Sequence, residues 1–168
     1  MEKTELGRWQ CCFRLSKYRE DIEAYRGRED GFHRMFMPYE VIEGKGNCLL
    51  NTGINEMWDL VTGASANHFD NTDAQIGVGD SATAADPDQT DLQAATNKTY
   101  KGMESGYPTS TAQKATFKSS FGADDANHAW NEWVVKQSTS AICLNRKMEG
   151  LGTKSGGTWT LEVEITLS

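Results

Sequence analysis

The chain has 168 residues and a formal net charge of −7, which leaves room for one domain or for one domain with an arm. Residues 62–97 contain six aspartates and no lysine or arginine, and such an acidic surface repels nucleic acid, so no nucleic-acid partner is expected. No apolar run approaches the ~20 residues that span a bilayer, and the first ten residues lack the apolar core of an export signal, so neither a membrane partner nor secretion is expected.

The composition favours a β domain with a small aromatic core. Five tryptophans and five tyrosines compensate for a low aliphatic content, while abundant threonine and glycine favour strands and turns. We expect such a domain to gain stability from association with partners. The four cysteines (Cys11, Cys12, Cys48 and Cys143) are irregularly spaced and form no CxxC pair, which favours reduced thiols over a disulfide framework or a zinc site.

The N-terminal part of the chain predicts a strand followed by a charged arm. Apolar residues alternate with polar ones over residues 7–18, which is the two-residue period of a half-buried strand. Residues 19–38 are charged and unpatterned, with a helical turn expected around residues 21–25. A second strand is expected over residues 35–43, with Pro38 marking an edge or a strand start. We therefore expect residues 1–38 to form an N-terminal strand with an arm or insertion, and residues 39–168 to form a β-sandwich domain.

One amphipathic helix is predicted over residues 51–63. Ile54, Met57, Trp58 and Val61 follow the i, i+3, i+4, i+7 spacing of a single apolar stripe, and Gly63 suits the position that ends a helix. We expect this stripe to cover the open end or side of the sandwich, which assigns Trp58 to the core.

The remainder of the chain predicts strands joined by loops. They are expected over residues 74–78, 98–103, 114–121, 129–136, 141–147 and 158–167. The last is the clearest, because Trp159, Leu161, Val163 and Ile165 share one face and are predicted to be core residues. About eight short strands at this spacing predict a mainly β fold, an antiparallel β-sandwich or jelly roll with one short amphipathic helix.

The stretch IGVGDSATAADPDQTDLQ (76–93) resembles a ligand loop but matches no standard one. It lacks the third glycine of a dinucleotide fingerprint, the lysine of a phosphate-binding loop, and the central glycine and closing glutamate of an EF-hand. A non-standard Ca²⁺ site through Asp86, Asp88 and Asp91 is a minor alternative. The favoured interpretation is a strand end followed by a short turn, with Asp86 as its cap and Pro87 in its first position.

No catalytic constellation is recognisable. His33, His68 and His128 lack metal-ligand spacing, no G-x-S-x-G elbow occurs, and Glu162 and Glu164 lie on the polar face of their strand. We therefore expect no enzyme activity, no cofactor and no resident metal.

Four segments occur in an order that resembles a known family. They are NCLLNTGINEMWDLV, AQIGVGDSATAADPDQTDLQAATNKTYKGMESGYP, ATFKSSFGADDANHAWNEWVV and LNRKMEGLGTKSGGTWTLEVEITLS. Together they resemble small virion structural proteins encoded by tailed bacteriophages and prophages, over residues 48–168 and more loosely over residues 7–18. The resemblance implies a virion protein made in the host cytoplasm, with no catalytic residues, and it assigns no role to residues 19–38.

Within that family, our first expectation is a capsid decoration (cement) protein. Such a protein would dock on the major capsid protein and act as a homo-trimer or dimer at local symmetry axes. The alternatives are a tail or neck adaptor, a tail-tip module, or a host-surface binding module. From charge and aromatic density we expect the arm and first strand to supply the contacts. The interface candidates are Trp9, Arg14, Tyr25, Phe32 and Phe36.

Overall fold

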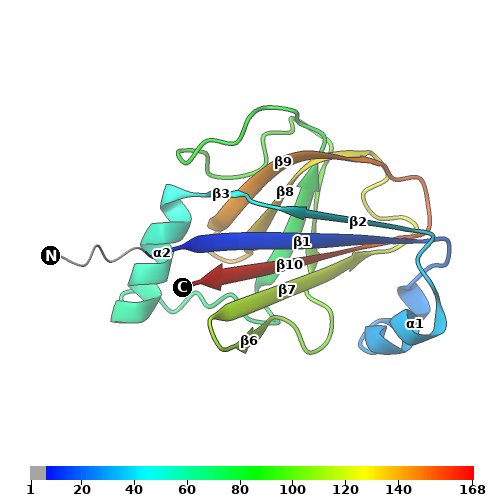
Figure 1. Ribbon diagram of the computed structural model, residues 1–168, viewed down its shortest axis with the longest axis horizontal. Coiled ribbons are helices and arrows are strands. Elements are labelled where there is room, and N and C mark those ends of the chain that lie inside the picture. The colour runs from blue at the N-terminus through cyan, green and yellow to red at the C-terminus, as the bar shows by residue number, and fades with distance from the viewer. Residues whose placement is uncertain (1–6) are drawn as a thin grey trace, which may run out of the picture.

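The computed structural model describes residues 7–168 as two five-stranded antiparallel sheets packed face to face (Figure 1). Sheet A has the order β2-β1-β10-β7-β6, and sheet B has the order β3-β9-β8-β4-β5. The strands are β1 (Trp9–Tyr18), β2 (Glu40–Lys45), β3 (Cys48–Leu49), β4 (Ala74–Gly79), β5 (Lys98–Gly102), β6 (Thr109–Thr111), β7 (Lys114–Phe121), β8 (Ala129–Gln137), β9 (Cys143–Thr153) and β10 (Thr158–Leu167). The predicted mainly β, antiparallel sandwich is confirmed; the strand order does not confirm a jelly roll.

The two α-helices of residues 7–168 lie at opposite ends of the sandwich. Helix α2 (Asn51–Thr62) lies beside the C-terminus, and α1 (Glu29–Met35) lies at the other end together with the 3-10 turn η1 (Glu23–Tyr25) (Figure 1). The sequence predicted one helix. It missed α1, because Phe32 is the only apolar side chain that this charged seven-residue helix buries.

Strand β1 is an interior strand of sheet A. It pairs with β10 from Trp9↔Leu167 to Tyr18↔Thr158 and with β2 on its other side. The predicted boundary at residue 38 therefore does not separate an N-terminal segment from the sandwich, because β1 lies between β2 and β10. Removing β1 would leave β2 without its partner strand.

The core lies between the two sheets and is rich in aromatic side chains. The Trp130 ring packs edge-on against Phe121 and Trp159, with ring centroids 4.8 and 4.9 Å apart. The other predicted core residues of β10 (Leu161, Val163 and Ile165) are buried beside it.

A bulge in β8 changes which side chains face this core. Alternation along a regular strand would place Trp130 and Trp133 on opposite faces. The register shifts between Trp130 and Glu132, and both tryptophans belong to the inter-sheet core. Glu132 and Val134 consequently face the other side of sheet B, beneath the loop of residues 80–97.

Helix α2 is present as predicted, but it is rotated relative to the predicted orientation. Gly53 and Glu56 are buried, whereas Trp58 and Val61 are 64% and 74% exposed. Helix α2 packs against β9 at Gly53, where a Cβ would lie 2.5 Å from the carbonyl oxygen of Leu144. This close backbone contact turns Trp58 and Val61 towards solvent, whereas Met57 packs against the core, so the assignment of Trp58 to the core is wrong.

The arm of residues 19–38 has a small core of its own. Tyr18, Ile22 and Phe32 form a buried cluster, and Tyr25 and Phe36 pack against it with partly exposed rings. The predicted helical turn around residues 21–25 corresponds to η1, and the following strand begins later than predicted, at Glu40.

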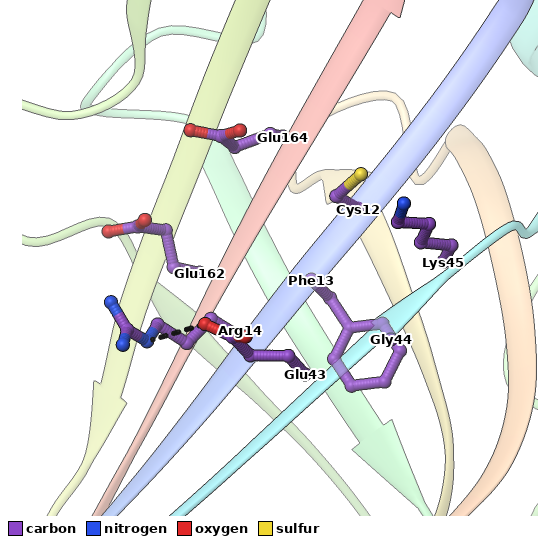
Figure 2. A pocket seen from close by; sticks show the side chains of 8 residues that line it. All are labelled: Cys12, Phe13, Arg14, Glu43, Gly44, Lys45, Glu162 and Glu164. Atoms are coloured by element: carbon purple, nitrogen blue, oxygen red, sulfur yellow. Dashed lines mark ion pairs between the residues drawn. The ribbon is translucent and has the colours of Figure 1, made fainter.

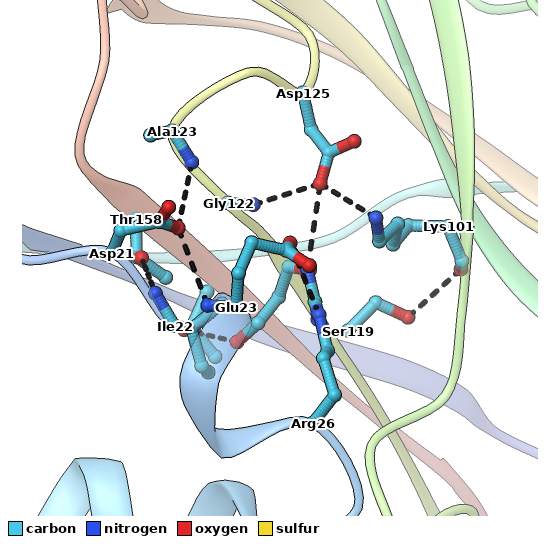
Figure 3. Close-up of polar contacts among 12 residues, drawn as sticks. Asp21, Ile22, Glu23, Arg26, Lys101, Ser119, Gly122, Ala123, Asp125 and Thr158 are labelled. Carbon is cyan, nitrogen blue, oxygen red and sulfur yellow. Dashed lines mark hydrogen bonds and ion pairs between the residues drawn. The ribbon is translucent and has the colours of Figure 1, made fainter.

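Ionic and hydrogen-bond contacts fix this arm to the end of the sandwich (Figure 3). Asp21 accepts a hydrogen bond from the backbone N–H of Ala123, and Arg26 contacts Asp125. Asp125 also accepts a hydrogen bond of 2.6 Å from Lys101. Burial opposes ionisation of Asp125, but these donors outweigh it and lower its pKa. The arm is therefore folded onto the sandwich through charged side chains.

Candidate binding surfaces

The acidic residues proposed as a Ca²⁺ site do not meet. Asp91 pairs with Lys136 and accepts a hydrogen bond from Tyr100, whereas Asp86 accepts one from the backbone of Asp88. The Asp88 carboxylate accepts instead from Asn51 at the start of α2. Within residues 7–168, no group of three His, Cys, Asp or Glu side chains is arranged to hold a metal ion.

The loop of residues 80–97 is held on sheet B by a buried ion pair. Arg146 and Glu132 are both fully buried, with nitrogen and oxygen 2.7 Å apart. Glu132 accepts backbone hydrogen bonds from Gln93 and Ala94, and Arg146 donates to Gln89. The favoured interpretation of this stretch as a turn and a crossing agrees with these contacts. The residues that hold it lie in β8 and β9 and were not singled out from the sequence.

The interface candidates lie in three different environments. Trp9 is partly buried and donates its Nε1–H to Asn47, and Arg14 lies on the outer face of sheet A. Tyr25 and Phe36 are partly exposed on the arm. Phe32 is fully buried in the arm cluster, so its assignment as an interface residue is wrong.

The outer face of sheet A carries an open groove of about 420 Å³ with mixed charge (Figure 2). Its charged lining side chains are Arg14, Glu43, Lys45, Glu162 and Glu164. Arg14 and Glu43 form an ion pair of 3.2 Å between two exposed side chains, which contributes little to stability. The neighbouring Cys12 is exposed, whereas Cys11 on the same strand points into the core.

These positions predict a large difference in thiol reactivity. Burial raises the pKa of Cys11 to about 12 and also raises the pKa of Cys143, so both stay protonated and covered at pH 8. We expect a thiol-reactive disulfide reagent to label Cys12 first in the native chain, ahead of the partly buried Cys48, whose pKa is also raised by burial. Mass spectrometry of the labelled peptide identifies the site, and Cys12→Ser should remove the rapid phase. Rapid labelling of Cys11 in the folded protein would contradict the packing of β1.

A second polar site joins α1 to sheet A. His33 lies 2.8 Å from the carboxylate of Glu104 and 3.1 Å from the Tyr18 hydroxyl. Glu104 is almost fully buried and also contacts Ser120 and Lys118. Burial opposes ionisation of Glu104, but the bond to His33, the charge of Lys118 and the bond to Ser120 together lower its pKa. His33 and Glu104 thus hold α1 against sheet A.

The lowered pKa of Glu104 predicts loss of stability in acid. A carboxyl whose pKa is lowered by folding stabilises the folded state above its unfolded pKa of about 4.3, and this contribution is lost as pH falls through the folded pKa. We expect the free energy of unfolding to decrease as the pH drops below about 4.5. The Glu104→Gln substitution should make this pH dependence weaker. Urea titrations between pH 3 and pH 7 measure the free energy of unfolding at each pH. A Glu104→Gln variant with the pH dependence of wild type would contradict the role assigned to Glu104.

The α2 end of the sandwich is apolar. The name α2 end denotes the exposed side chains of Trp58 and Val61 on α2, together with a pocket that is lined by Met57 of α2 and by the exposed Leu167. The pocket has a volume of about 430 Å³, and its largest apolar lining residues are Trp9, Met57, Phe69, Phe117, Leu144 and Ile165. Exposed large apolar side chains on a helix that also lines an apolar pocket are typical of a protein–protein contact.

The fold and these surfaces define an antiparallel β-sandwich with an apolar end and a charged outer face. Comparisons with protein-family models, curated proteins and solved structures find no match to the chain. No helix within residues 7–168 combines the length and apolar character needed to cross a membrane.

Proposed function

We propose that this protein is a structural component of a tailed-phage virion, a capsid decoration protein that docks on the major capsid protein and stabilises the shell. The observation that carries the proposal is the α2 end, where helix α2 exposes Trp58 and Val61 and also contributes Met57 to an apolar pocket. The resemblance of residues 48–168 to virion structural proteins is the reason for proposing a virion protein, the major capsid protein, as the partner.

The energetics of Trp58 support a docking role over a folding role. An exposed tryptophan contributes little to the stability of the folded chain, whereas one buried at the centre of an interface commonly contributes 2 kcal/mol or more to binding. Covering Trp58 and Val61 together removes a large apolar area from water. The α2 end therefore fits a contact that forms on assembly.

Copy number in purified particles tests the proposed location. We expect quantitative mass spectrometry to give a simple ratio to the major capsid protein, near one to one or another capsomer fraction. A count of a dozen or fewer per particle would overturn the decoration assignment and favour a neck or tail ring.

A variant at the α2 end tests the docking surface. We expect Trp58→Ala to weaken binding to capsid shells by about 2 kcal/mol, roughly thirtyfold in Kd, without a loss of thermal stability. The matched control is Met148→Ala, which truncates an exposed apolar side chain on β9. Co-sedimentation of each variant with undecorated shells gives the affinities. Equal binding by Trp58→Ala and wild type would place the contact elsewhere.

A further inference from the structure

A small polar pocket opens on the outer face of sheet A, at the end of the sandwich where α1 lies (Figure 1). Side chains of β1, β7, β10 and α1 line it, and its volume is about 150 Å³. The name α1 pocket denotes this site. Pockets for drug-sized ligands measure about 300–1,000 Å³, so the α1 pocket has room for one small molecule or for one unit of a longer chain.

The register of sheet A gives the α1 pocket its floor and one wall. Ser16 on β1 lies opposite Thr160 on β10, and these two short side chains form the floor. Two residues away on the same face, Arg14 lies opposite Glu162, and these longer side chains form a wall (Figure 2). The step from short hydroxyl side chains to long charged ones creates the depression.

Helix α1 supplies the opposite wall. Tyr18 follows Ser16 on the same face of β1, and its hydroxyl lies 3.1 Å from Nδ1 of His33 on α1. Nε2 of His33 lies 2.8 Å from the carboxylate of Glu104, which fixes the imidazole in place. The arm of residues 19–38 therefore completes a pocket that the sheet alone would leave open on this side.

Lys118 on β7 contributes an ammonium group whose ionic contacts are long. Its side chain is only 16% exposed, yet carboxylate oxygens of Glu104 and Glu162 lie 3.6 and 3.7 Å from its Nζ, beyond hydrogen-bond distance. Lys114, on the same face of β7, reaches Glu164 at 2.8 Å with a side chain 41% exposed. A largely buried ammonium with long contacts gains a hydrogen bond when a ligand oxygen approaches it.

The charges at the α1 pocket occur in pairs of opposite sign. Each basic side chain has a carboxylate beside it; the pairs are Arg14 with Glu43, Lys118 with Glu162, and His33 with Glu104. An ion of either sign would therefore meet like charge as well as opposite charge. A neutral hydroxyl group suits such a site, because it can donate to a carboxylate and accept from an ammonium group in charge-assisted hydrogen bonds.

We propose that the α1 pocket binds one ring of a neutral sugar, with Glu162 accepting a hydrogen bond from one sugar hydroxyl and Lys118 donating to another. Several hydroxyls on a small ring match the mixed donors and acceptors of the pocket, and the short side chains of Ser16 and Thr160 leave space for the ring. This inference does not rest on the proposed function, because shell docking is assigned to the α2 end.

An NMR titration with neutral methyl hexopyranosides tests the proposal. The probes are the methyl α-glycosides of glucose, galactose and mannose. We expect at least one of them to give saturable chemical-shift changes centred on residues 14–18 and 160–162. Sodium phosphate and sodium sulfate, matched in ionic strength, should give none there. Absence of saturable changes with all three glycosides, or saturable binding of phosphate at these residues, would overturn the proposal.

A matched pair of leucine substitutions on β1 locates the site. Ser16→Leu fills the floor of the α1 pocket and should raise the glycoside dissociation constant by roughly tenfold or more, because the space that buries the ligand is occupied. Cys12→Leu places the same side chain on the same face of β1 outside the pocket, and it should leave binding unchanged. Wild-type affinity in Ser16→Leu would overturn the proposed site.

A second pair keeps the test valid if Ser16→Leu fails to fold. Glu162→Gln should weaken glycoside binding by about tenfold, the usual effect of losing a hydrogen bond to a charged group. Its control is Glu164→Gln on the same face of β10, whose carboxylate pairs with Lys114 outside the pocket. Equal affinities in these two variants would overturn the proposed site. Shell binding is measured separately, so its failure does not affect this result.

Discussion

Replacing Glu132 with glutamine is expected to lower the free energy of unfolding by about 3–5 kcal/mol, the usual cost of breaking a buried ion pair from one side. Arg146 would keep its charge at a fully buried position, 2.7 Å from where the carboxylate oxygen had been. An uncompensated buried charge loses the hydration that it had in the unfolded chain and gains nothing equivalent in return.

The loss should be concentrated in the loop of residues 80–97. The Glu132 carboxylate accepts hydrogen bonds from the backbone of Gln93 and Ala94, so the substitution weakens the attachment of this loop to sheet B. We therefore expect hydrogen exchange to accelerate at residues 80–97 more than in β1 or β10.

Urea unfolding of Glu132→Gln against wild type measures the loss of stability. The control makes the same chemical change at Glu162, which lies 3.7 Å from Lys118 and is partly exposed. Because partly exposed ion pairs contribute little, Glu162→Gln should cost less than about 1 kcal/mol. Comparable losses in both variants would mean that the Glu132–Arg146 pair has no special role.

The strands were predictable because their pattern is local. In β10 every second residue is apolar, and the structure buries Trp159, Leu161, Val163 and Ile165 between the sheets. The same reasoning failed in β8, where a bulge changes the phase between Trp130 and Glu132. A bulge depends on the neighbouring strand, so alternation within one segment cannot reveal it.

The surfaces were less predictable than the strands, because exposure depends on contacts distant in sequence. The exposed residues Met37, Tyr39 and Val41 lie within the predicted strand of residues 35–43, but only the strand order shows that β2 is an edge. Similarly, the sequence of residues 19–38 is that of a polar segment. Phe32 is nevertheless buried there, by Tyr18 and Ile22 before it and by Phe36 after it.

Helix α2 shows how one backbone contact can override a helical pattern. The spacing of Ile54, Met57, Trp58 and Val61 gives an apolar stripe, and such a stripe normally faces the core. Two nearby positions, Gly53 and Glu56, are buried instead. The determining feature is the absence of a side chain at Gly53, which lets the helix approach the backbone of β9.

Gly53→Ala is therefore expected to destabilise the protein, although alanine favours a helix over glycine by about 1 kcal/mol. The added Cβ would lie 2.5 Å from the carbonyl oxygen and 2.7 Å from the Cα of Leu144. The backbone of an interior strand is held by hydrogen bonds on both sides and cannot shift as the end of a flexible side chain can. Helix α2 must therefore move away from β9. We expect a net loss of about 1–3 kcal/mol, the range for overpacked positions.

Asn55→Ala is the control for this prediction, because it adds the same helix-favouring residue at an exposed position two residues further along α2. It should leave stability unchanged or raise it by a few tenths of a kcal/mol. Thermal unfolding gives both effects, and faster hydrogen exchange in α2 reports a displaced helix. A Gly53→Ala variant as stable as Asn55→Ala would show that α2 does not pack on β9 at this distance. If Trp58 docks on the shell as proposed, its displacement should also make Gly53→Ala bind capsid shells more weakly than Asn55→Ala does.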